Sequence, residues 1–311
     1  MKSDFVKISG SVVSVGLLSL VLPFAASAAK INATLSHESG DYGSDYNYSG
    51  PRFDMTINPD GSNWYYSLGY RDREHESDQT YKRADVDIAY RFRFDGGWVQ
   101  PSINLRKDTT MYNSGTRIVL EKYMAETKYL YSFNDSWGIW GEVQFSLDKQ
   151  TSDKFNDSPD SNMQSNYLSW EIEPGVRYYF ANSSRLTVSY YNVGQRSDKG
   201  DTWGLTDDKS SQQARIYYYW KMPFGLSFSP YIRLPLGYGD TSAWYDSASF
   251  DHTKTMSKTS RYALQLAYPL TDTFQLQAEY YIEDTEYKEG FNMGKEDGQA
   301  KYLKFGVRAA F

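Results

Sequence analysis

Three features of the sequence together predict an all-β fold, a transmembrane antiparallel up-and-down β-barrel of 14 strands with short periplasmic turns and long extracellular loops. The chain ends on strict alternation from Leu303 to Phe311, in which apolar residues occupy every second position up to a terminal aromatic. Aromatic residues make up 17% of the 311 residues, an excess that girdles at the two membrane interfaces would explain. No segment after the N-terminal region has 18 consecutive apolar residues, so a membrane crossing here needs strands rather than helices.

The first 28 residues are a predicted signal peptide. Lys2 and Lys7 precede an apolar run at 12–24, and small residues follow at 26–28, an order typical of a secretory signal with cleavage after Ala28. The predicted domains are therefore a signal peptide, 1–28, and an outer-membrane β-barrel, 29–311, in the cell outer membrane of a Gram-negative bacterium. Because the chain has no cysteine, a disulfide framework is excluded for the exported part.

The first half of the mature chain predicts seven strands. Turn-forming residues at 58–61, 95–97 and 134–136 join strands into hairpins. Ile118 and Leu120 are out of phase with the following apolar positions, Tyr123 and Ala125, so we expect a bulge or a boundary between them. The expected strands contain residues 31–35, 53–57, 64–70, 86–94, 99–105, 123–133 and 137–147.

The second half repeats the pattern, with short turns at 182–184, 223–225 and 271–273. Each strand is expected to have about the 9–11 residues that a tilted crossing needs. An even strand number leaves both termini on the periplasmic side and the long loops outside. A soluble β-sandwich would share the alternation, but not the regular exchange of short turns and long loops together with a signal peptide. The expected strands contain residues 168–180, 186–190, 214–222, 226–234, 262–270, 274–282 and 303–311.

The positions between the apolar residues carry charges and predict a wet interior. A charge facing lipid near the midplane costs about 2–4 kcal/mol, so these side chains must meet water. Either they pair across strands and plug the lumen, or they line an open pore; we expect the pore, since 14 strands enclose more space than side chains fill. The near balance of cations and acids predicts weak ion selectivity. The predicted pore-lining residues are Arg91, Arg93, Arg177, Arg215, Arg233, Arg261, Glu142, Glu171, Glu173 and Glu279, and the same face carries Arg71, Arg106, Lys304, Arg308, Asp54, Asp85, Asp87 and Glu283.

Aromatic residues also fall on the inward parity. They could stack on sugar rings and form a weak slide for saccharides, or they could be girdle and rim residues; both interpretations stay open from the sequence. The residues are Tyr65, Trp140, Tyr179, Tyr217, Tyr219, Tyr231 and Tyr281.

The longest expected loop covers residues 235–256. It contains Gly237, Gly239, Trp244 and Tyr245, and a long loop with glycine hinges at a pore mouth is a candidate gating loop. A solvated surface loop is the alternative. At the other end of the chain, the terminal Phe311 resembles the assembly signal that the bacterial barrel-assembly machinery reads.

In its middle part the chain resembles the monomeric outer membrane porin G (OmpG) family. The stretches that carry the resemblance are GVRYYF through LTVSYYN at 175–192, SPYIRLPL at 229–236 and VDIAYRFRF at 86–94. The resemblance implies a monomeric, fairly nonselective channel that the sixth loop gates. That family's acid closure is associated with facing histidines on strands 12 and 13. The histidines of this chain, His37, His75 and His252, lie near or in the expected loops, so closure by that route is not expected.

The predicted function is that of an outer-membrane porin, a water-filled and weakly selective channel for passive diffusion of small hydrophilic solutes, ions and mono- or oligosaccharides. The alternatives are a substrate-selective oligosaccharide channel and an outer-membrane barrel enzyme, a lipase or protease. Ser36–His37 and Asp251–His252 are the pairs that an enzyme could use. No catalytic residue, metal or cofactor is expected. The expected partners are outer-membrane lipid and lipopolysaccharide, the barrel-assembly machinery, and small hydrophilic solutes or oligosaccharides, with no nucleic acid and with the protein as a monomer.

Overall fold

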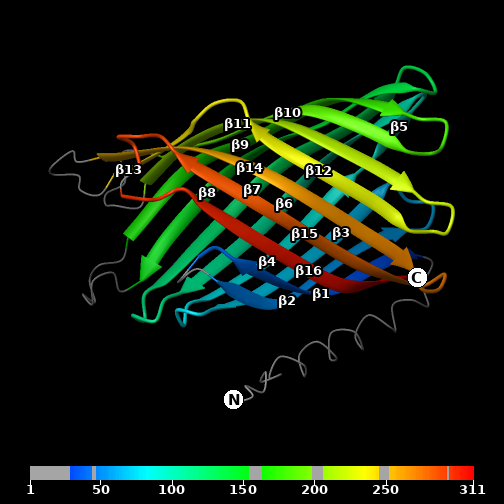
Figure 1. Ribbon diagram of the computed structural model, residues 1–311. Helices are drawn as coiled ribbons and strands as arrows, with labels where there is room; N and C mark the ends of the chain where they lie inside the picture. Colours follow the sequence, from blue (N-terminus) through cyan, green and yellow to red (C-terminus); the bar gives the residue numbers. More distant parts are fainter. Residues whose placement is uncertain (1–28, 44–46, 154–162, 198–205, 245–251, 293) are drawn as a thin grey trace, which may run out of the picture.

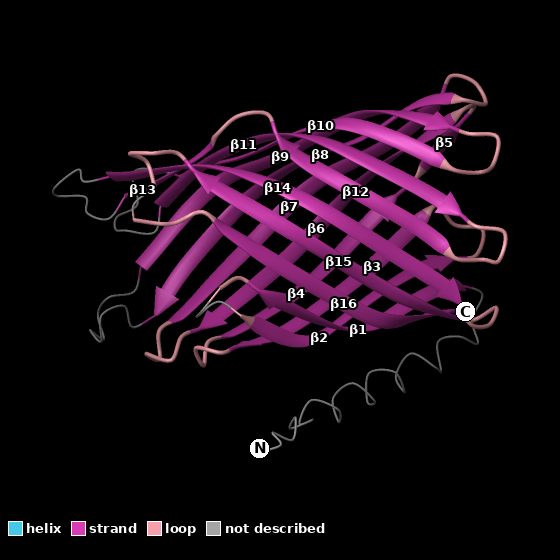
Figure 2. Ribbon diagram, viewed as in Figure 1, coloured by secondary structure: helices cyan, strands magenta, loops and turns pink. Residues whose placement is uncertain are grey.

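The structure is a closed antiparallel β-barrel of 14 strands, two of which are interrupted and therefore carry two labels each. The computed structural model describes residues 29–43, 47–153, 163–197, 206–244, 252–292 and 294–311. These residues form no helix (Figure 2). Nor do they contain any helix long and apolar enough to cross a bilayer. The predicted signal peptide, 1–28, lies outside the described residues. The strands are β1 (Ala29–Asp41), β2 (Tyr48–Pro59), β3 (Trp64–His75), β4 (Thr80–Tyr90), β5 (Phe92–Phe94), β6 (Gly97–Met111), β7 (Arg117–Ser132), β8 (Trp137–Asp153), β9 (Met163–Tyr179), β10 (Arg185–Ser197), β11 (Thr206–Lys221), β12 (Ser227–Pro235), β13 (Gly239–Trp244), β14 (His252–Pro269), β15 (Phe274–Tyr287) and β16 (Gly298–Ala310).

Two of the 14 barrel strands are interrupted, and each is divided into two labelled segments. β5 continues β4 beyond Arg91, and both strands pair with β6. β13 continues β12, and both pair with β11 and β14. Pro235 is paired with Gln213 and Asp240 with Ser210, so the β12–β13 side has more residues between these pairs than β11 does, which is a bulge. The predicted fold class and strand number are confirmed.

The barrel closes between its first and last strands. β1 pairs with β16 along most of its length, and Phe311 exchanges two backbone hydrogen bonds of 2.9 Å with Ile31. The terminal aromatic thus lies at the seam, next to the start of β1 (Figure 1). Because closure leaves no free strand edge, the backbone groups of the wall are paired within the wall itself, as lipid requires.

The two ends of the barrel differ as the sequence predicted. Short turns lie at the end that holds the C-terminus, and long connections lie at the other (Figure 1). Gly96 and Gly225 have positive φ angles of 79° and 91° within the short turns expected at 95–97 and 223–225. We call these the turn end and the loop end.

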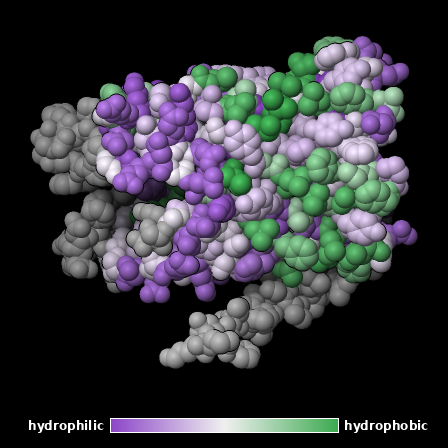
Figure 3. All heavy atoms as spheres, viewed as in Figure 1, coloured by the Kyte–Doolittle hydropathy of each residue, from purple (hydrophilic) through white to green (hydrophobic). Residues whose placement is uncertain are grey.

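The outer face is apolar over only part of its height. Hydrophobic side chains gather over the half near the turn end, and hydrophilic side chains cover the half near the loop end (Figure 3). Ile103 and Leu147 are both 65% exposed on this outer face. β8 has 17 residues and β14 has 18, so the expectation of about 9–11 residues for every strand was wrong. Apolar alternation marks the section that meets lipid, while the ladder of hydrogen bonds continues beyond it.

The bulge expected near residue 120 was also wrong. β7 pairs without interruption with β6 from Arg117 to Tyr131 and with β8 from Arg117 to Ser132. Tyr123 is exposed and Met124 is buried, so even-numbered residues of β7 face inward. Ile118 and Leu120 are therefore apolar residues on the inner face near the loop end, which explains the change of phase without any change of register.

Gly306, in β16, is required by the close approach of the seam strands. A Cβ added there would lie 2.5 Å from the Ser36 Cβ and 2.6 Å from the Leu35 carbonyl oxygen. We expect Gly306→Ala to lower the free energy of unfolding by about 1–3 kcal/mol, the usual range for overpacking. Urea titration of the refolded barrel, followed by gel mobility, measures this change. Gly237→Ala is the matched control because a Cβ there meets nothing within 4 Å; equal stability of the two variants would contradict the close approach.

Candidate functional site: the charged lumen

The pore-lining residues predicted from the sequence occupy the face opposite the exposed apolar side chains. In β9, for example, Leu168 and Val176 are exposed to the outside, whereas Glu173, of the other parity, is 2% exposed. Arg91 lies at the break between β4 and β5, and the other predicted residues lie within strands. The residues so placed are Arg91, Arg93, Arg177, Arg215, Arg233, Arg261, Glu142, Glu171, Glu173 and Glu279.

Two of these residues, Arg215 and Glu173, meet in a cluster around the buried carboxylate of Glu173. Arg215 donates to Glu173 at 2.7 Å, and the hydroxyls of Ser189 and Tyr217 donate at 2.6 and 3.1 Å. The guanidinium of Arg215 also lies over the ring of Tyr191. A carboxylate with three donors meets the demand that a buried charge be both paired and hydrogen-bonded.

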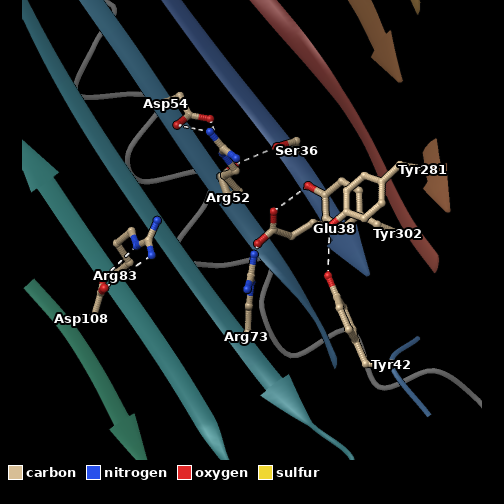
Figure 4. A network of polar contacts seen from close by, with 10 residues as sticks. All are labelled: Ser36, Glu38, Tyr42, Arg52, Asp54, Arg73, Arg83, Asp108, Tyr281 and Tyr302. Carbon is tan, nitrogen blue, oxygen red and sulfur yellow. Dashed lines mark hydrogen bonds and ion pairs between the residues drawn. The ribbon is translucent and has the colours of Figure 1, made fainter. Parts of the chain in front are cut away.

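A second network, near the seam, was missed by the sequence analysis (Figure 4). Glu38 has no exposed side-chain surface. It accepts hydrogen bonds from Arg73 at 2.6 Å and from the hydroxyl of Tyr302 at 2.9 Å. In the same region Arg83 pairs with Asp108 at 2.8 Å. These residues have the inward parity, but they lie beyond the apolar runs used to set the strand limits, so only strands extended toward the loop end would have revealed them.

Another buried carboxylate, Asp148 in β8, was missed for the same reason. Lys122 lies 2.8 Å from it, and the hydroxyl of Ser169 donates to it at 2.7 Å. Ser146 is a further hydrogen-bond donor to Asp148. The interior of the loop-end half is therefore held by compensated ionic clusters.

Arginines form two rows across adjacent strands. In the first row Arg71 of β3 lies directly between Arg52 of β2 and Arg83 of β4. In the second row, Arg233 of β12 has Arg215 of β11 on one side and an arginine of β14 on the other. That third member is Arg261. Like charges directly opposite each other destabilise a sheet, so these rows are unfavourable for the fold.

Each outer member of a row has its own carboxylate. Arg52 bonds Asp54 at 2.6 Å, and the pairs formed by Arg83 and Arg215 are described above. The Arg261 Nε donates to Glu283 at 2.8 Å. The central members, Arg71 and Arg233, have no carboxylate within ion-pair distance among the described residues.

One cavity brings the two rows together. It has a volume of about 360 Å³. β2–β3 and β11–β12 belong to different parts of the wall, because β1, β16, β15 and β14 lie between β2 and β12 in the strand order. Because both contribute to this one space, side chains reach across the lumen at this level. The lining residues are Arg52, Arg71, Arg73, Arg233, Arg261, Tyr217, Tyr231, Tyr281, Tyr302, Gln265 and Glu279.

Most of the inward-facing aromatic rings form cation–π contacts with arginine guanidinium groups. Arg261 lies 4.0 Å from the ring centroid of Tyr281, and Arg91 lies 4.6 Å from that of Tyr65. Arg185 lies 4.3 Å from the ring of Tyr219. Such cation–π contacts hold the arginine side chains against the wall. They also occupy ring faces that a stacking sugar would need, which weakens the slide interpretation of these aromatics.

The segment expected to be a long gating loop is mostly strand. Gly239 and Trp244 are the first and last residues of β13, and Gly237 lies in the bulge between β12 and β13. Tyr238 donates a hydrogen bond of 2.9 Å to Glu286, which raises the pKa of the tyrosine hydroxyl. The loop predicted for 235–256 is therefore shorter, because its polar residues pair with β11 and β14. Tyr245 lies outside the described residues.

Ser36 and His37 do not form a nucleophile–base pair. Successive residues of a strand point to opposite faces. Ser36 is buried on the inner side and donates to the carbonyl oxygen of Arg52, whereas His37 is exposed on the outer side. The side chains of Asp251 and His252 lie outside the described residues.

Comparison with known proteins gives a fold but no family. No family model matches the chain, and no curated protein matches it. The structure is similar to that of the CymD monoaromatic hydrocarbon channel, with a TM-score of 0.53 and 6% identity over 92% of this chain and 89% of that chain. Outer-membrane expressed OmpT of Vibrio cholerae matches with a TM-score of 0.48 and 10% identity, over 92% of this chain and 99% of that one. At such identities a likeness concerns the fold alone, which is that of the outer-membrane β-barrels.

We expect Glu38→Ala to lower the free energy of unfolding by about 3–5 kcal/mol, because it leaves Arg73 without its carboxylate in a largely buried position. Adding Arg73→Met should recover much of this loss. Urea titration of the single and double variants measures the coupling between the two residues.

The matched control is Asp153→Ala at the loop end. Arg117 and Asp153 are 2.8 Å apart, and both side chains are more than 40% exposed, so this change should cost about 0–1 kcal/mol. Equal losses for Glu38→Ala and Asp153→Ala would refute the role assigned to burial.

Proposed function

We propose that this protein is an outer-membrane porin, a monomeric, water-filled channel through which small hydrophilic solutes, ions and saccharides diffuse passively. One observation carries the proposal: charged and polar side chains occupy the inner face of the wall, from Glu38 in β1 to Lys304 in β16. Charged groups inside a membrane protein face water or one another. A barrel of this size encloses more space than its side chains fill, so water reaches them.

The apolar belt on the outer face supports a membrane location. The belt lies near the turn end (Figure 3), so the longer strands extend beyond the lipid at the loop end. In outer-membrane barrels the short turns are periplasmic and the long loops are extracellular. We therefore assign the loop end to the cell exterior, and Phe311 to the periplasmic side, where it would serve as the assembly signal. The resemblance to the porin G family belongs to the same proposal.

A barrel enzyme is less well supported. The nucleophile–base pair suggested by Ser36 and His37 is divided between the two faces of β1. A lipase or protease would need a base within hydrogen-bond reach of its nucleophile. A selective channel is the stronger alternative, since the two arginine rows line one cavity.

Single-channel recording tests the porin proposal directly. The refolded mature chain, residues 29–311, should give steady current steps in the nanosiemens range that are not grouped in threes, because a monomer has one pore. Protein denatured by heat before insertion is the control. A correctly folded barrel that conducts no ions would mean that the interior is plugged, and the porin proposal would then be wrong.

The bulge at 236–238 would serve as the hinge of a gate at the loop end. Tyr238 connects this bulge to Glu286 of β15, so Tyr238→Phe should increase the frequency of brief closures in the same recordings. Tyr66→Phe, on the outer face, is the control, since Tyr66 is exposed there. An unchanged closure frequency in Tyr238→Phe would argue against gating by this segment.

A further inference from the structure

The two unpaired arginines lie at equivalent places in two separate parts of the wall. Arg71 is flanked on both sides by arginines that already hold carboxylates, and so is Arg233. Both residues line the same cavity of about 360 Å³. The Nε atom of Arg233 is buried and has no hydrogen-bond partner. The cavity therefore contains two guanidinium charges, one from each part of the wall, that have no carboxylate within ion-pair distance among the described residues.

This arrangement is costly for the fold alone. Each central arginine faces two like charges across the sheet, which is destabilising, and a buried donor without an acceptor adds a further cost. Arg233 lies 5.2 Å from the ring centroid of Tyr231, but neither central arginine has a carboxylate within ion-pair distance among the described residues. A local conflict of this kind is typical of a site that serves a ligand. The missing partner is an anion.

We propose that Arg71 and Arg233 together bind a solute with two anionic groups across the lumen, one group at each part of the wall, and thereby make this level of the channel selective for anions; we call such solutes dianions for their two anionic groups, whatever the charge of each group. This inference rests on the proposed porin function and adds a solute class to it. The shared chemistry of the solute is that of two oxyanion groups, either the carboxylates of an acidic sugar or metabolite, or the phosphates of a sugar bisphosphate. Arginine suits both, because its planar guanidinium donates two parallel hydrogen bonds to a carboxylate or a phosphate.

The neighbouring side chains support the anion without neutralising it. Arg52, Arg73 and Arg261 also line the cavity, and their own carboxylates leave them with further N–H donors. Glu279 is the one acid of the lining, and Lys304 holds it at 2.8 Å. Rings of arginine are a recurring means of selecting anions in pores. The size of the cavity, at the lower end of the range for ligand pockets, suits a solute of one or two rings.

Two electrical measurements on the mature chain in planar bilayers test this proposal. The first is the reversal potential in a gradient of potassium chloride, which should show a preference for anions. The second is the blocking of the current by digalacturonate, succinate and fructose 1,6-bisphosphate, with galacturonate and maltose as the monoanionic and neutral sugars. Dianions should block at concentrations at least about tenfold lower than galacturonate does, because they gain a second charged hydrogen-bonded contact.

The three test solutes, each of which has two anionic groups, distinguish the sources of the shared chemistry. Stronger blocking by digalacturonate assigns the site to acidic sugars, stronger blocking by succinate assigns it to small dicarboxylates, and stronger blocking by the bisphosphate assigns it to phosphorylated sugars. Each of these outcomes supports a dianion site. Equal blocking by galacturonate and digalacturonate, or none by any dianion, would overturn it.

Arg71→Gln and Arg233→Gln should each weaken blocking by dianions about tenfold, the loss of one charged contact, and shift the reversal potential toward cations. Arg117→Gln is the control, because Arg117 is exposed at the loop end and pairs with Asp153. Both lumen variants should be at least as stable toward urea as the original chain, since each removes a repulsive charge. A variant that loses stability while its selectivity stays unchanged would show that the arginine serves the fold and would overturn the proposal.

Failure of this inference is distinguishable from failure of the porin proposal. A chain that conducts without anion preference and without block by dianions is a porin without this site. A folded chain that does not conduct at all removes the porin function, and the dianion site that rests on it falls with it.

Discussion

The structure depends on one constraint, that every backbone N–H and C=O group in contact with lipid must be paired within the protein. The pairing of β1 with β16 meets this constraint by removing the last free edge. Closure in turn divides every strand into an outer and an inner set of side chains, because successive residues point to opposite faces. Phe305 on the outside and Lys304 on the inside are one residue apart, and yet one meets lipid and the other an ion pair. The charged inner surface of the barrel is therefore a direct consequence of how the backbone hydrogen bonds are paired.

The inner surface is organised by how completely its charges are compensated. Glu38, Asp148 and Glu173 are almost fully buried, and each has a cation and at least one hydroxyl donor. Such clusters hold the wall in a fixed shape, because the removal of one partner leaves a charge with neither water nor a counterion. Arg71 and Arg233 differ from them in having neighbours of the same sign and, among the residues that the structure describes, no carboxylate within ion-pair distance. On the proposal that Arg71 and Arg233 bind a solute, this contrast separates the groups that maintain the barrel from those that meet the solute.

The sequence predicted the inward side of each strand better than it predicted where the strands end. Apolar alternation located 14 strands and placed Arg233 and Glu173 on the inner face, because lipid imposes a strict period of two. It began β2 too late to include Arg52, and it treated β13 as a loop, because beyond the lipid both sides of a strand can be polar. The phase change at Leu120 suggested a bulge, where the structure has an apolar side chain facing inward.

The sequence by itself determined the barrel class, the parity of its strands and the charged character of the interior. Each of these follows from local alternation and from the high cost of a charge in lipid. Only the tertiary structure decided which charges share a level of the lumen. Register between strands places Arg71 between two other arginines, and closure brings Arg233, distant in sequence, to the same cavity. A count of inward charges averages over the whole wall and predicts weak selectivity, whereas electrostatic interactions depend on distance, which the fold alone sets.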